Sequence, residues 1–292
     1  MKVLIVGKDS YIGTNIKKAL LSRGHEVEEL DTLSEAISAD RFSNVASVIH
    51  VAAIVHRKDI EDYEIYKAVN VDLPVKVATV AKNAGVKQFV FFSSMAVYGK
   101  EKSYNDFWID ENTPLNPRSL YGKSKLEAEN QLFQLESDDF GVCAIRPANV
   151  YGKGCRGEYI KKFKKITTAL PMIPNAFENT KQGLIYIDNL CELVKLIVEN
   201  NARGVYAAQD KYAVSTVELM QEIARAIGIK KKKSNFTGFL VKLIRFSAVK
   251  KLYGGIAYRE KYASTELGDY NIIDFAEAIT KTYQQAEDEK NV

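Results

Sequence analysis

Val-Leu-Ile-Val-Gly-Lys-Asp-Ser-Tyr-Ile-Gly occupies residues 3–13 and decides how the rest of the chain folds. Its first four residues form a continuous apolar run, which is typical of a parallel strand covered on both faces. A helical pattern follows through Leu21, and Gly24 ends it because glycine accepts the left-handed conformation found beyond helix ends. A second strand at 26–30 is followed by Asp31. This order of strand, glycine turn, helix, strand and acidic residue predicts a dinucleotide-binding unit.

The glycine turn has the residue types that close contact with a pyrophosphate requires. Gly7 allows the tight turn off the strand, the small Ser10 lets the backbone approach the phosphates, and Gly13 lets helix and strand pack closely. Tyr11 and Ile12 open the helix, whose N-terminus supplies amide donors and a partial positive charge. We therefore predict that this turn binds the phosphates of the cofactor.

The acidic residue after the second strand distinguishes between two related cofactors. Asp31 can accept a hydrogen bond from a ribose hydroxyl and would repel a 2′-phosphate, which favours NAD over NADP. The alternative is a βαβ unit that binds no nucleotide, and the position of Asp31 argues against it.

Strand and helix patterns alternate beyond this unit. Strands are predicted at 46–53, 88–92 and 141–145, with helices at 63–84 and 121–135 between them. Such alternation favours an α/β fold, a Rossmann-type doubly wound parallel sheet. Ligands of such sheets bind outside the carboxyl ends of the strands.

The pattern loosens after Gly152. We predict an NAD-binding domain at 1–150, to which residues 183–208 return, and a smaller C-terminal substrate-binding domain at 151–292. The remaining elements are expected as strands at 184–187 and 204–208, helices at 158–168, 188–199 and 272–283, a helix capped by Ser215 or Thr216 that runs to 226, and a loop at 105–118.

A tyrosine and a lysine are brought together in Tyr121-Gly122-Lys123-Ser124-Lys125. Residues four apart lie on one face of a helix, a turn from each other. A phenol with an unperturbed pKa of about 10 is a poor base at neutral pH, and a neighbouring ammonium lowers that pKa. The pair is a candidate general acid and base, although Tyr-x-x-x-Lys also occurs by chance on surface helices.

Composition excludes several classes of protein. The chain has 292 residues, 46% of them hydrophobic and 27% charged, as in ordinary soluble domains, and its net charge of +4 is too small to indicate a nucleic-acid partner. Cys143, Cys155 and Cys191 have no metal-binding or disulfide spacing, so no metal site is expected. A strand that begins at the first Met leaves no room for a signal peptide, and no apolar run approaches ~18 residues. We therefore expect a cytoplasmic protein without an integral membrane segment.

Further motifs follow one another in a defined order. They are His50-Val51-Ala52-Ala53, Asn70-Val71-Asp72, Ser93-Ser94-Met95-Ala96-Val97-Tyr98-Gly99 and Arg146-Pro147-x-Asn149-x-Tyr151-Gly152. With these and the stretches above, the chain resembles the extended short-chain dehydrogenase/reductases. Within them it is similar to the nucleotide-sugar epimerase/dehydratase family, in particular to UDP-glucose 4-epimerase-like members. The resemblance covers roughly residues 1–210 and is more specific for the family than for the substrate.

The resemblance implies roles in catalysis for three residues. Tyr121 would exchange the proton of a sugar hydroxyl. Lys125 would bind the nicotinamide ribose and lower the pKa of Tyr121. Ser94 would hydrogen-bond the reacting oxygen of the substrate.

The resemblance also implies binding roles around these residues. Asn70 would be buried and hydrogen-bonded near the active-site helix. The NAD site would be lined, beside the glycine turn and Asp31, by Val51, Ala52, Ala53, Asn70, Tyr121, Lys125 and Pro147. A nucleoside diphosphate sugar, expected to be a UDP-sugar, would contact Ser94, Asn149, Arg156 and Lys181.

Three departures from the family pattern bear on function. Ser10 replaces the central glycine of the turn and is still small enough to approach phosphate. Met95 and Ala96 replace the Asp-Glu pair with which dehydratases eliminate a hydroxyl, which disfavours dehydration. Lys181 lies near the place of a family arginine and offers its charge without a bidentate fork.

We therefore predict an NAD-dependent epimerase that acts at C4 through a 4-keto intermediate, in sugar biosynthesis for surface polysaccharides. A nucleotide-sugar 4-keto reductase that uses NAD(P)H is the alternative. A non-catalytic nucleotide-binding protein is a third hypothesis, which the intact catalytic set argues against. A homodimer is considered as an assembly.

Residues 236–253 mix apolar and basic side chains. This composition allows peripheral attachment to a membrane surface, but packing against the sheet domain is the expected use.

Overall fold

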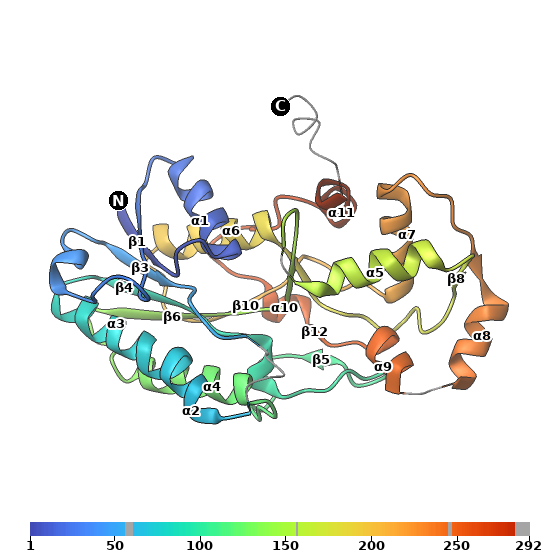
Figure 1. Ribbon diagram of the computed structural model, residues 1–292, viewed down its shortest axis with the longest axis horizontal. Coiled ribbons are helices and arrows are strands. Elements are labelled where there is room, and N and C mark those ends of the chain that lie inside the picture. The colour runs from blue at the N-terminus through green and yellow to red at the C-terminus, as the bar shows by residue number, and fades with distance from the viewer. Residues whose placement is uncertain (56–60, 156, 245–246, 284–292) are drawn as a thin grey trace.

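The computed structural model describes residues 1–55, 61–155, 157–244 and 247–283. Figure 1 shows them as an elongated molecule, with a sheet and its helices at one end and shorter elements at the other. In chain order the elements are β1 (Lys2–Val6), α1 (Tyr11–Leu21), β2 (Glu26–Leu30), η1 (Ala39–Phe42), β3 (Ser47–His50), α2 (Tyr63–Lys67), η2 (Ala68–Asp72), α3 (Leu73–Asn83), β4 (Gln88–Phe92), η3 (Met95–Tyr98), β5 (Trp108–Ile109), α4 (Leu120–Phe133), β6 (Gly141–Pro147), β7 (Asn149–Tyr151), α5 (Glu158–Ala169), β8 (Ile173–Pro174), β9 (Leu184–Tyr186), α6 (Ile187–Glu199), β10 (Gly204–Ala208), α7 (Thr216–Ala226), β11 (Lys233–Ser234), α8 (Asn235–Ile244), α9 (Ser247–Tyr253), β12 (Ala257–Tyr258), α10 (Glu260–Ala263) and α11 (Phe275–Tyr283).

Six parallel strands form the central sheet in the order β10-β6-β4-β3-β1-β2. β1 lies between β2 and β3, and its last residue, Val6, pairs with Leu30 on one side and His50 on the other. After β1 the chain adds β2 on one side of it, and then adds β3 and the later strands on the other side. Open α/β sheets bind their ligands at such a topological switch. The predicted Rossmann-type parallel sheet is confirmed.

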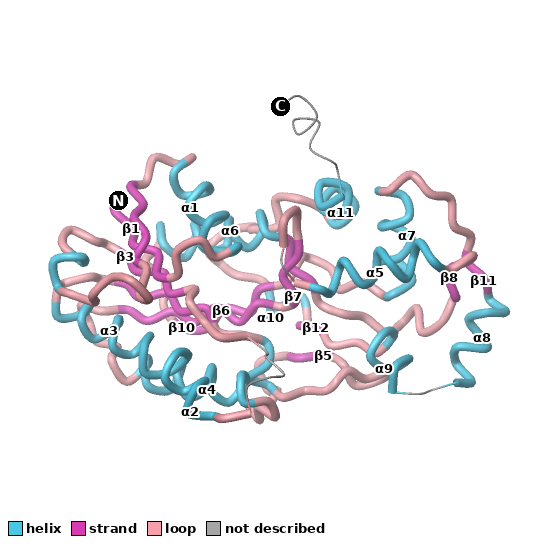
Figure 2. The backbone as a smooth tube through the Cα atoms, viewed as in Figure 1, coloured by secondary structure: helices cyan, strands magenta, loops and turns pink. Residues whose placement is uncertain are grey.

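Helices cover both faces of the sheet, and β1 shows why its sequence is apolar throughout. Successive side chains of a strand point to opposite faces. Val3 and Ile5 belong to the core that includes α1 and α6, whereas Leu4 and Val6 belong to the core that includes α3 and α4. Figure 2 shows these helices in cyan on either side of the magenta strands.

The segment predicted as one helix at 63–84 is divided into three parts. α2 and α3 are α-helical, and the five residues of η2 between them form a π-helix. Pro74 follows at the start of α3, and because proline has no amide hydrogen it cannot extend the regular ladder. This change of pitch places Asn70 inside the protein, where it is 0% exposed.

The second half of the chain joins the sheet in one place and forms smaller layers elsewhere. β10 is the edge strand beside β6, and α6 packs against α1 on the sheet. The predicted strand at 184–187 is observed as β9, but it pairs with β7 outside the central sheet. The predicted loop at 105–118 contains β5, which pairs with β12. α7 begins at Ser215, one of the two caps that the sequence predicts, and Glu218 completes a capping box that was not predicted.

Candidate active site

The carboxyl ends of β1 and β3 approach each other at the switch point. Gly7 has φ = 120°, and a Cβ at this residue would lie 2.8 Å from the amide nitrogen of Ala52 and 2.9 Å from Val51 Cγ2. Glycine alone leaves this approach open without strain. Val51, Ala52 and Ala53 are partly exposed where they border the turn. The geometry of the turn fits a pyrophosphate that must come close to backbone.

Ser10 does more than keep the turn small. It is the N-cap of α1, and its hydroxyl accepts a hydrogen bond of 3.1 Å from the amide of Gly13. A Cβ on Gly13 would lie 2.6 Å from the same hydroxyl, so the cap requires glycine there. The helical pattern gives the amides of Tyr11 and Ile12 no partner within the helix, which leaves them to an anion. The sequence predicted the small residue but not the cap.

Asp31 lies immediately beyond β2, beside the glycine turn. The amide of Gly7 donates to the carbonyl of Leu30, which joins the two strand ends. Asp31 accepts hydrogen bonds from the Ser34 hydroxyl at 2.7 Å and from the amide of Leu33 at 3.0 Å. These two bonds lower the pKa of the carboxyl, so it is charged at neutral pH. An ionised, accessible carboxylate here suits a ribose diol and opposes a 2′-phosphate.

Ser94, Tyr121 and Lys125 come together at the carboxyl end of β4. Ser94 caps η3, and the phenol of Tyr121 hydrogen-bonds its side chain. α4 begins one residue earlier than predicted and is capped by Ser119, whose hydroxyl accepts from the amide of Gly122 at 3.0 Å. Lys125 Nζ lies 6.0 Å from the ring centroid of Tyr121 and donates to the carbonyl of Phe92 at 2.7 Å. The structure thus brings together the three residues predicted as catalytic.

Burial dominates the acid–base properties of this pair. Burial raises the pKa of Tyr121 above its ordinary value, and the hydrogen bond to Ser94 acts in the lowering direction. Burial also lowers the pKa of Lys125 to about 7, while Glu129 acts to raise it. The prediction that Lys125 lowers the pKa of Tyr121 is therefore wrong for the protein without its cofactor, in which the pKa of Tyr121 is raised. The physical reason is that Tyr121 is only 9% exposed and Lys125 directs its ammonium at a backbone carbonyl.

Asn70 links the exit of β3 to α4. Its side-chain amide donates to the carbonyl of Ile54 at 2.9 Å and to the Ser124 hydroxyl at 3.0 Å, and its oxygen accepts from the amide of Ile54 at 2.9 Å. Ser124 in turn donates to the carbonyl of Tyr121 at 2.9 Å. Because its amide is occupied by these bonds and fully buried, Asn70 positions the loop and the helix around the predicted cofactor site.

An ion pair behind the catalytic residues was not predicted from the sequence. Arg146 bonds Glu129 through two nitrogens, at 2.6 and 3.0 Å, and both residues are buried. Arg146 also donates to the Tyr98 hydroxyl at 2.9 Å. Glu129 is four residues after Lys125 on α4, so this bidentate pair fixes the helix that carries Tyr121 and Lys125 to β6 and η3. Charged residues at helical spacing in the motif's own helix were the only available hint.

The exit of β6 supplies the predicted substrate-side residues. Pro147 ends β6 and is partly exposed, and Asn149 opens β7 with an exposed side chain. β7 and β9 pair in register from Asn149 with Leu184, so this exit is joined to the C-terminal half. Arg156, also predicted to contact the substrate, lies outside the described residues.

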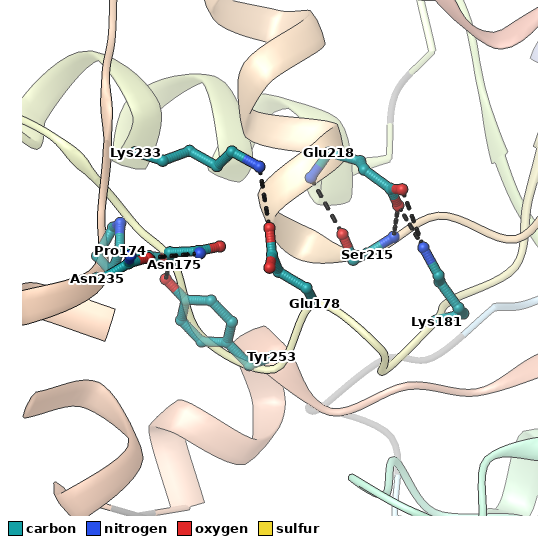
Figure 3. Close-up of polar contacts among 9 residues, drawn as sticks. All are labelled: Pro174, Asn175, Glu178, Lys181, Ser215, Glu218, Lys233, Asn235 and Tyr253. Carbon is teal, nitrogen blue, oxygen red and sulfur yellow. Dashed lines mark hydrogen bonds and ion pairs between the residues drawn. The ribbon is translucent and has the colours of Figure 1, made fainter. Parts of the chain in front are cut away.

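Lys181 has a carboxylate partner in the structure. Its ammonium contacts both oxygens of Glu218, at 2.7 and 3.0 Å, and Glu218 also closes the capping box of α7 with Ser215 (Figure 3). A phosphate would have to compete with that carboxylate for Lys181. The diphosphate role of Lys181 stays a prediction.

Lys102 is a half-buried cation that the sequence did not single out. Its ammonium lies 5.1 Å from the ring centroid of Tyr159, and it donates to the carbonyl of Lys251 at 3.2 Å and to Gln182 Oε1 at 3.3 Å. Burial, followed by the charge of Lys162, lowers its pKa to about 8. Lys102 contacts α5, α9 and the segment before β9, all of which belong to the C-terminal half. Its ammonium is therefore a second candidate, beside Lys181, for binding a diphosphate.

This arrangement can move a proton between a hydroxyl and a buried phenol. Ser94 and Tyr121 can both hydrogen-bond one substrate oxygen, and Lys125 can hold a ribose hydroxyl next to them. Met95 and Ala96 follow Ser94 and carry no ionisable group. These two positions therefore lack the Asp and Glu side chains with which dehydratases eliminate a hydroxyl.

Comparisons with known proteins identify the same region. The model of the NAD dependent epimerase/dehydratase family matches residues 3–212. UDP-glucose 4-epimerase of Vibrio cholerae is 30% identical over 249 residues, which cover 77% of this chain and 75% of that protein. N-acetyl-alpha-D-glucosaminyl-diphospho-ditrans,octacis-undecaprenol 4-epimerase of Escherichia coli O157:H7 is 29% identical over 246 residues, 78% of this chain and 73% of that protein.

Solved structures share the fold over nearly the whole chain. MoeE5, solved in complex with UDP-glucose and NAD, has a TM-score of 0.75 at 22% identity and covers 97% of both chains. WbmG of Bordetella bronchiseptica, solved in complex with NAD, has a TM-score of 0.72 at 22% identity and covers 97% of this chain and 92% of that one. These likenesses include the C-terminal half, for which the sequence offered no motif.

Proposed function

The chain belongs to the NAD-dependent epimerase/dehydratase family, and we propose that it inverts C4 of a nucleoside diphosphate sugar, a UDP-sugar in the first place. The observation that carries the proposal is the hydrogen-bonded pair of Ser94 and Tyr121 at the carboxyl edge of the sheet, with Lys125 one helical turn beyond. The names of the two curated relatives support a 4-epimerase.

The proposed mechanism assigns one task to each residue. NAD, when bound, supplies the acceptor and donor of hydride. Tyr121 removes the proton of the C4 hydroxyl and returns it after the 4-keto sugar has presented its other face. Ser94 orients the reacting oxygen by hydrogen bonding, and Lys125 holds the ribose and adds positive charge beside the phenol.

The cofactor is held by residues that suit NAD. Gly7, Ser10 and the start of α1 would bind the pyrophosphate, and Asp31 would bind the adenosine ribose. Val51, Ala52 and Ala53 would border the cofactor, with Pro147 on the β6 side. The proposed substrate residues are Asn149, Lys181 and Lys102, with Arg156 beyond the described residues. We place this reaction in the cytoplasm, in the supply of sugars for surface polysaccharides.

Replacing Tyr121 by phenylalanine tests the assignment. A positioned acid or base typically contributes ~10²–10⁴-fold, so Tyr121→Phe should lower the turnover of UDP-glucose or UDP-N-acetylglucosamine by at least that order. The thermal stabilisation by UDP-sugar should remain, because the phenol oxygen reacts with the sugar and does not anchor the nucleotide. Tyr212→Phe, at a side chain that is 64% exposed, is the matched control and should keep full turnover.

The state of the cofactor separates the proposal from its alternative. An epimerase regenerates NAD in every cycle and so shows no net change in NADH absorbance during turnover. Stoichiometric consumption of NAD(P)H with a 4-keto sugar would establish the reductase instead. Free monosaccharides that stabilise the protein as well as UDP-sugars do would refute nucleotide-sugar binding.

A further inference from the structure

The apolar face of α8 points to solvent and not to the protein core. Phe236, Phe239, Leu240, Leu243 and Ile244 follow the spacing i, i+3, i+4, i+7, i+8, which places them on one face. That face is exposed: the five side chains are 72%, 58%, 41%, 65% and 48% accessible. The stripe of a globular helix normally faces the interior, and contiguous exposed apolar surface marks an interaction site.

The opposite face of α8 is already used for packing. Gly238 is buried, and a Cβ there would lie 2.2 Å from the carbonyl oxygen of Asn175. Asn175 follows β8, and its side chain contacts Asn235 at the start of α8 at 2.7 Å (Figure 3). The helix is therefore held firmly by this close backbone approach. It cannot turn its apolar stripe inward.

The segment around the stripe is basic throughout. No Asp or Glu occurs between Glu222 and Glu260. The lysines of this segment are Lys230, Lys231, Lys232, Lys233, Lys242, Lys250 and Lys251. Carboxylates of other elements face two of them: Glu178 lies 3.0 Å from Lys233 and Glu101 lies 3.7 Å from Lys250.

Four of these lysines keep their charge available. Lys230, Lys232, Lys242 and Lys251 are exposed, and none forms an ion pair with a residue that the structure describes. Figure 1 shows α8 and α9 toward the end of the molecule opposite β1 and β3. One end of the molecule thus combines protruding apolar side chains with unneutralised positive charge.

We propose that this end binds the surface of an anionic lipid bilayer, with the α8 stripe inserted among the acyl chains and the lysines at the headgroups. A basic helix with one apolar face is the usual device for lying in a membrane interface. In the described chain, no helix is long and apolar enough to cross a membrane, so the contact is peripheral. The inference goes beyond the proposed function and does not depend on the identity of the sugar.

Charge favours a lipid surface over a second copy of this chain. Two copies that met through their α8 faces would place both sets of lysines against each other, and like charges repel. Anionic headgroups neutralise the same lysines. One curated relative is named for a sugar carried on an undecaprenol diphosphate.

A cleft of about 500 Å³ adjoins the stripe. Phe239 and Lys242 of α8 line it together with Phe177, Glu178 and other residues of the loop after β8. Because variants at Phe239 or Lys242 would alter this cleft as well as the surface, the test uses Phe236 and Leu243. These are the two most exposed members of the stripe, and neither lines the cleft or takes part in the catalytic site.

The test measures binding of the full-length chain to vesicles by flotation. Wild type should float with vesicles of phosphatidylcholine containing phosphatidylglycerol and should bind pure phosphatidylcholine at least tenfold more weakly. Phe236→Ser/Leu243→Ser should reduce binding to the anionic vesicles at least tenfold. Tyr212→Ser/Ile272→Ser replaces two large exposed side chains elsewhere, 64% and 55% accessible, and should bind as wild type.

Two further variants separate the apolar from the electrostatic contribution. Phe236→Trp should show a blue shift of its emission on addition of anionic vesicles, relative to wild type with its single Trp108. Lys232→Gln/Lys251→Gln should weaken binding several-fold and flatten its salt dependence, whereas Lys18→Gln/Lys76→Gln, at exposed lysines of α1 and α3, should not.

Several results would overturn the inference. Wild type that fails to float with anionic vesicles would do so, as would equal binding by wild type and Phe236→Ser/Leu243→Ser. A wild-type dimer that becomes monomeric in this variant, measured by ultracentrifugation without lipid, would make the face a self-interface. Thermal stabilisation by NAD and UDP-sugar should be unchanged in all of these variants, so failure here is distinct from failure of the proposed function.

Discussion

Tyr121 and Lys125 lie on one face of α4, and burial acts on both of them. It favours the neutral phenol and the neutral amine, so the pKa of Tyr121 is raised and that of Lys125 is lowered to about 7. Because the Tyr121 phenol is hard to ionise within the protein, its phenolate must be stabilised by a positive charge that binds beside it. Oxidised nicotinamide carries such a charge, so we expect bound NAD to lower the pKa of Tyr121.

Spectroscopic titration of Tyr121 tests this coupling. The tyrosinate signal that is lost in Tyr121→Phe should titrate above the ordinary value of about 10 in the protein alone, and lower when NAD is in excess. Lys125→Met should weaken this response and shift the pH dependence of turnover to the alkaline side, because the phenolate loses a neighbouring charge. The exposed neighbour Lys123 provides the control, Lys123→Met, which should titrate as wild type. A Tyr121 pKa that does not respond to NAD would contradict the mechanism.

The sequence identified the candidate catalytic residues but not the direction in which the pKa of Tyr121 is shifted. Tyr121 and Lys125 could be named from their helical spacing, and Ser94 from the family motif that the chain resembles. The direction of the Tyr121 pKa could not be predicted, because it is set by the burial of the phenol, and the smaller electrostatic contribution of Tyr66 also comes from another part of the chain. Lys102 was missed for the same reason, since its burial comes from α5 and α9.

Among the elements, the π-helical η2 has the clearest functional effect. It interrupts what the sequence shows as one amphipathic helix, and it places Asn70 between Ile54 and Ser124. A hydrogen-bond ladder that changes pitch leaves no mark on apolar periodicity, so it could not be predicted. In contrast, the N-cap of α7 depends on local chemistry, and the sequence limited it to Ser215 or Thr216, of which the structure has Ser215.

Asn70→Ala should both destabilise the protein and weaken its cofactor site. The change leaves the amide and carbonyl of Ile54 without their side-chain partner, and a buried unsatisfied polar group costs about 1–3 kcal/mol. Urea unfolding should show a loss of that order, and the Kd for NAD should rise because the loop after β3 is no longer fixed to α4.

Asn83→Ala provides the comparison for this variant. Asn83 is exposed at the end of α3, so its replacement should leave both the unfolding free energy and NAD affinity nearly unchanged. An Asn70→Ala protein with wild-type NAD affinity would show that Asn70 supports the fold alone.

On the scale of the whole molecule, Asp210 joins the sheet to the smaller layers. It follows β10 and accepts hydrogen bonds from the amide of Tyr186 at 2.9 Å, from Asn189 at 2.8 Å and from the Tyr151 hydroxyl at 2.9 Å. Burial nevertheless raises its pKa from 3.8 to about 6. The folded state therefore holds a proton on Asp210 more tightly than the unfolded chain does.

The sign of the resulting pH dependence follows from this difference. Asp210 favours folding below pH 3.8, and this contribution is lost as the pH rises to about 6. Asp210→Asn carries no titrating group, so its stability relative to wild type should rise over that window by up to about 3 kcal/mol. Urea unfolding at a series of pH values would measure the difference. Asp139→Asn, at a side chain that is 94% exposed, should show no such trend, and a pH-independent difference for Asp210→Asn would refute the argument.

The parallel sheet was predictable in kind, but the place of the short strand at 184–187 was not. Alternation of apolar strands and amphipathic helices specifies a parallel sheet, and Gly7 and Asp31 indicate where the first two strands end. The partners of 184–187 were beyond reach, because three apolar residues pair equally well in the sheet or, as β9 does, beside β7.

The late position of β10 has a consequence for how this protein can be made in the cell. β10 completes the sheet beside β6 from residues 204–208, after α5, β8 and β9 have been synthesised. α6, which covers Ile16 and Leu20 of α1, is equally late. A ribosome that has produced only the first 150 residues therefore holds a nascent chain whose β6 has an unpaired edge and whose first helix has a bare apolar face. Such a chain is exposed to strand-to-strand aggregation until translation has passed residue 208.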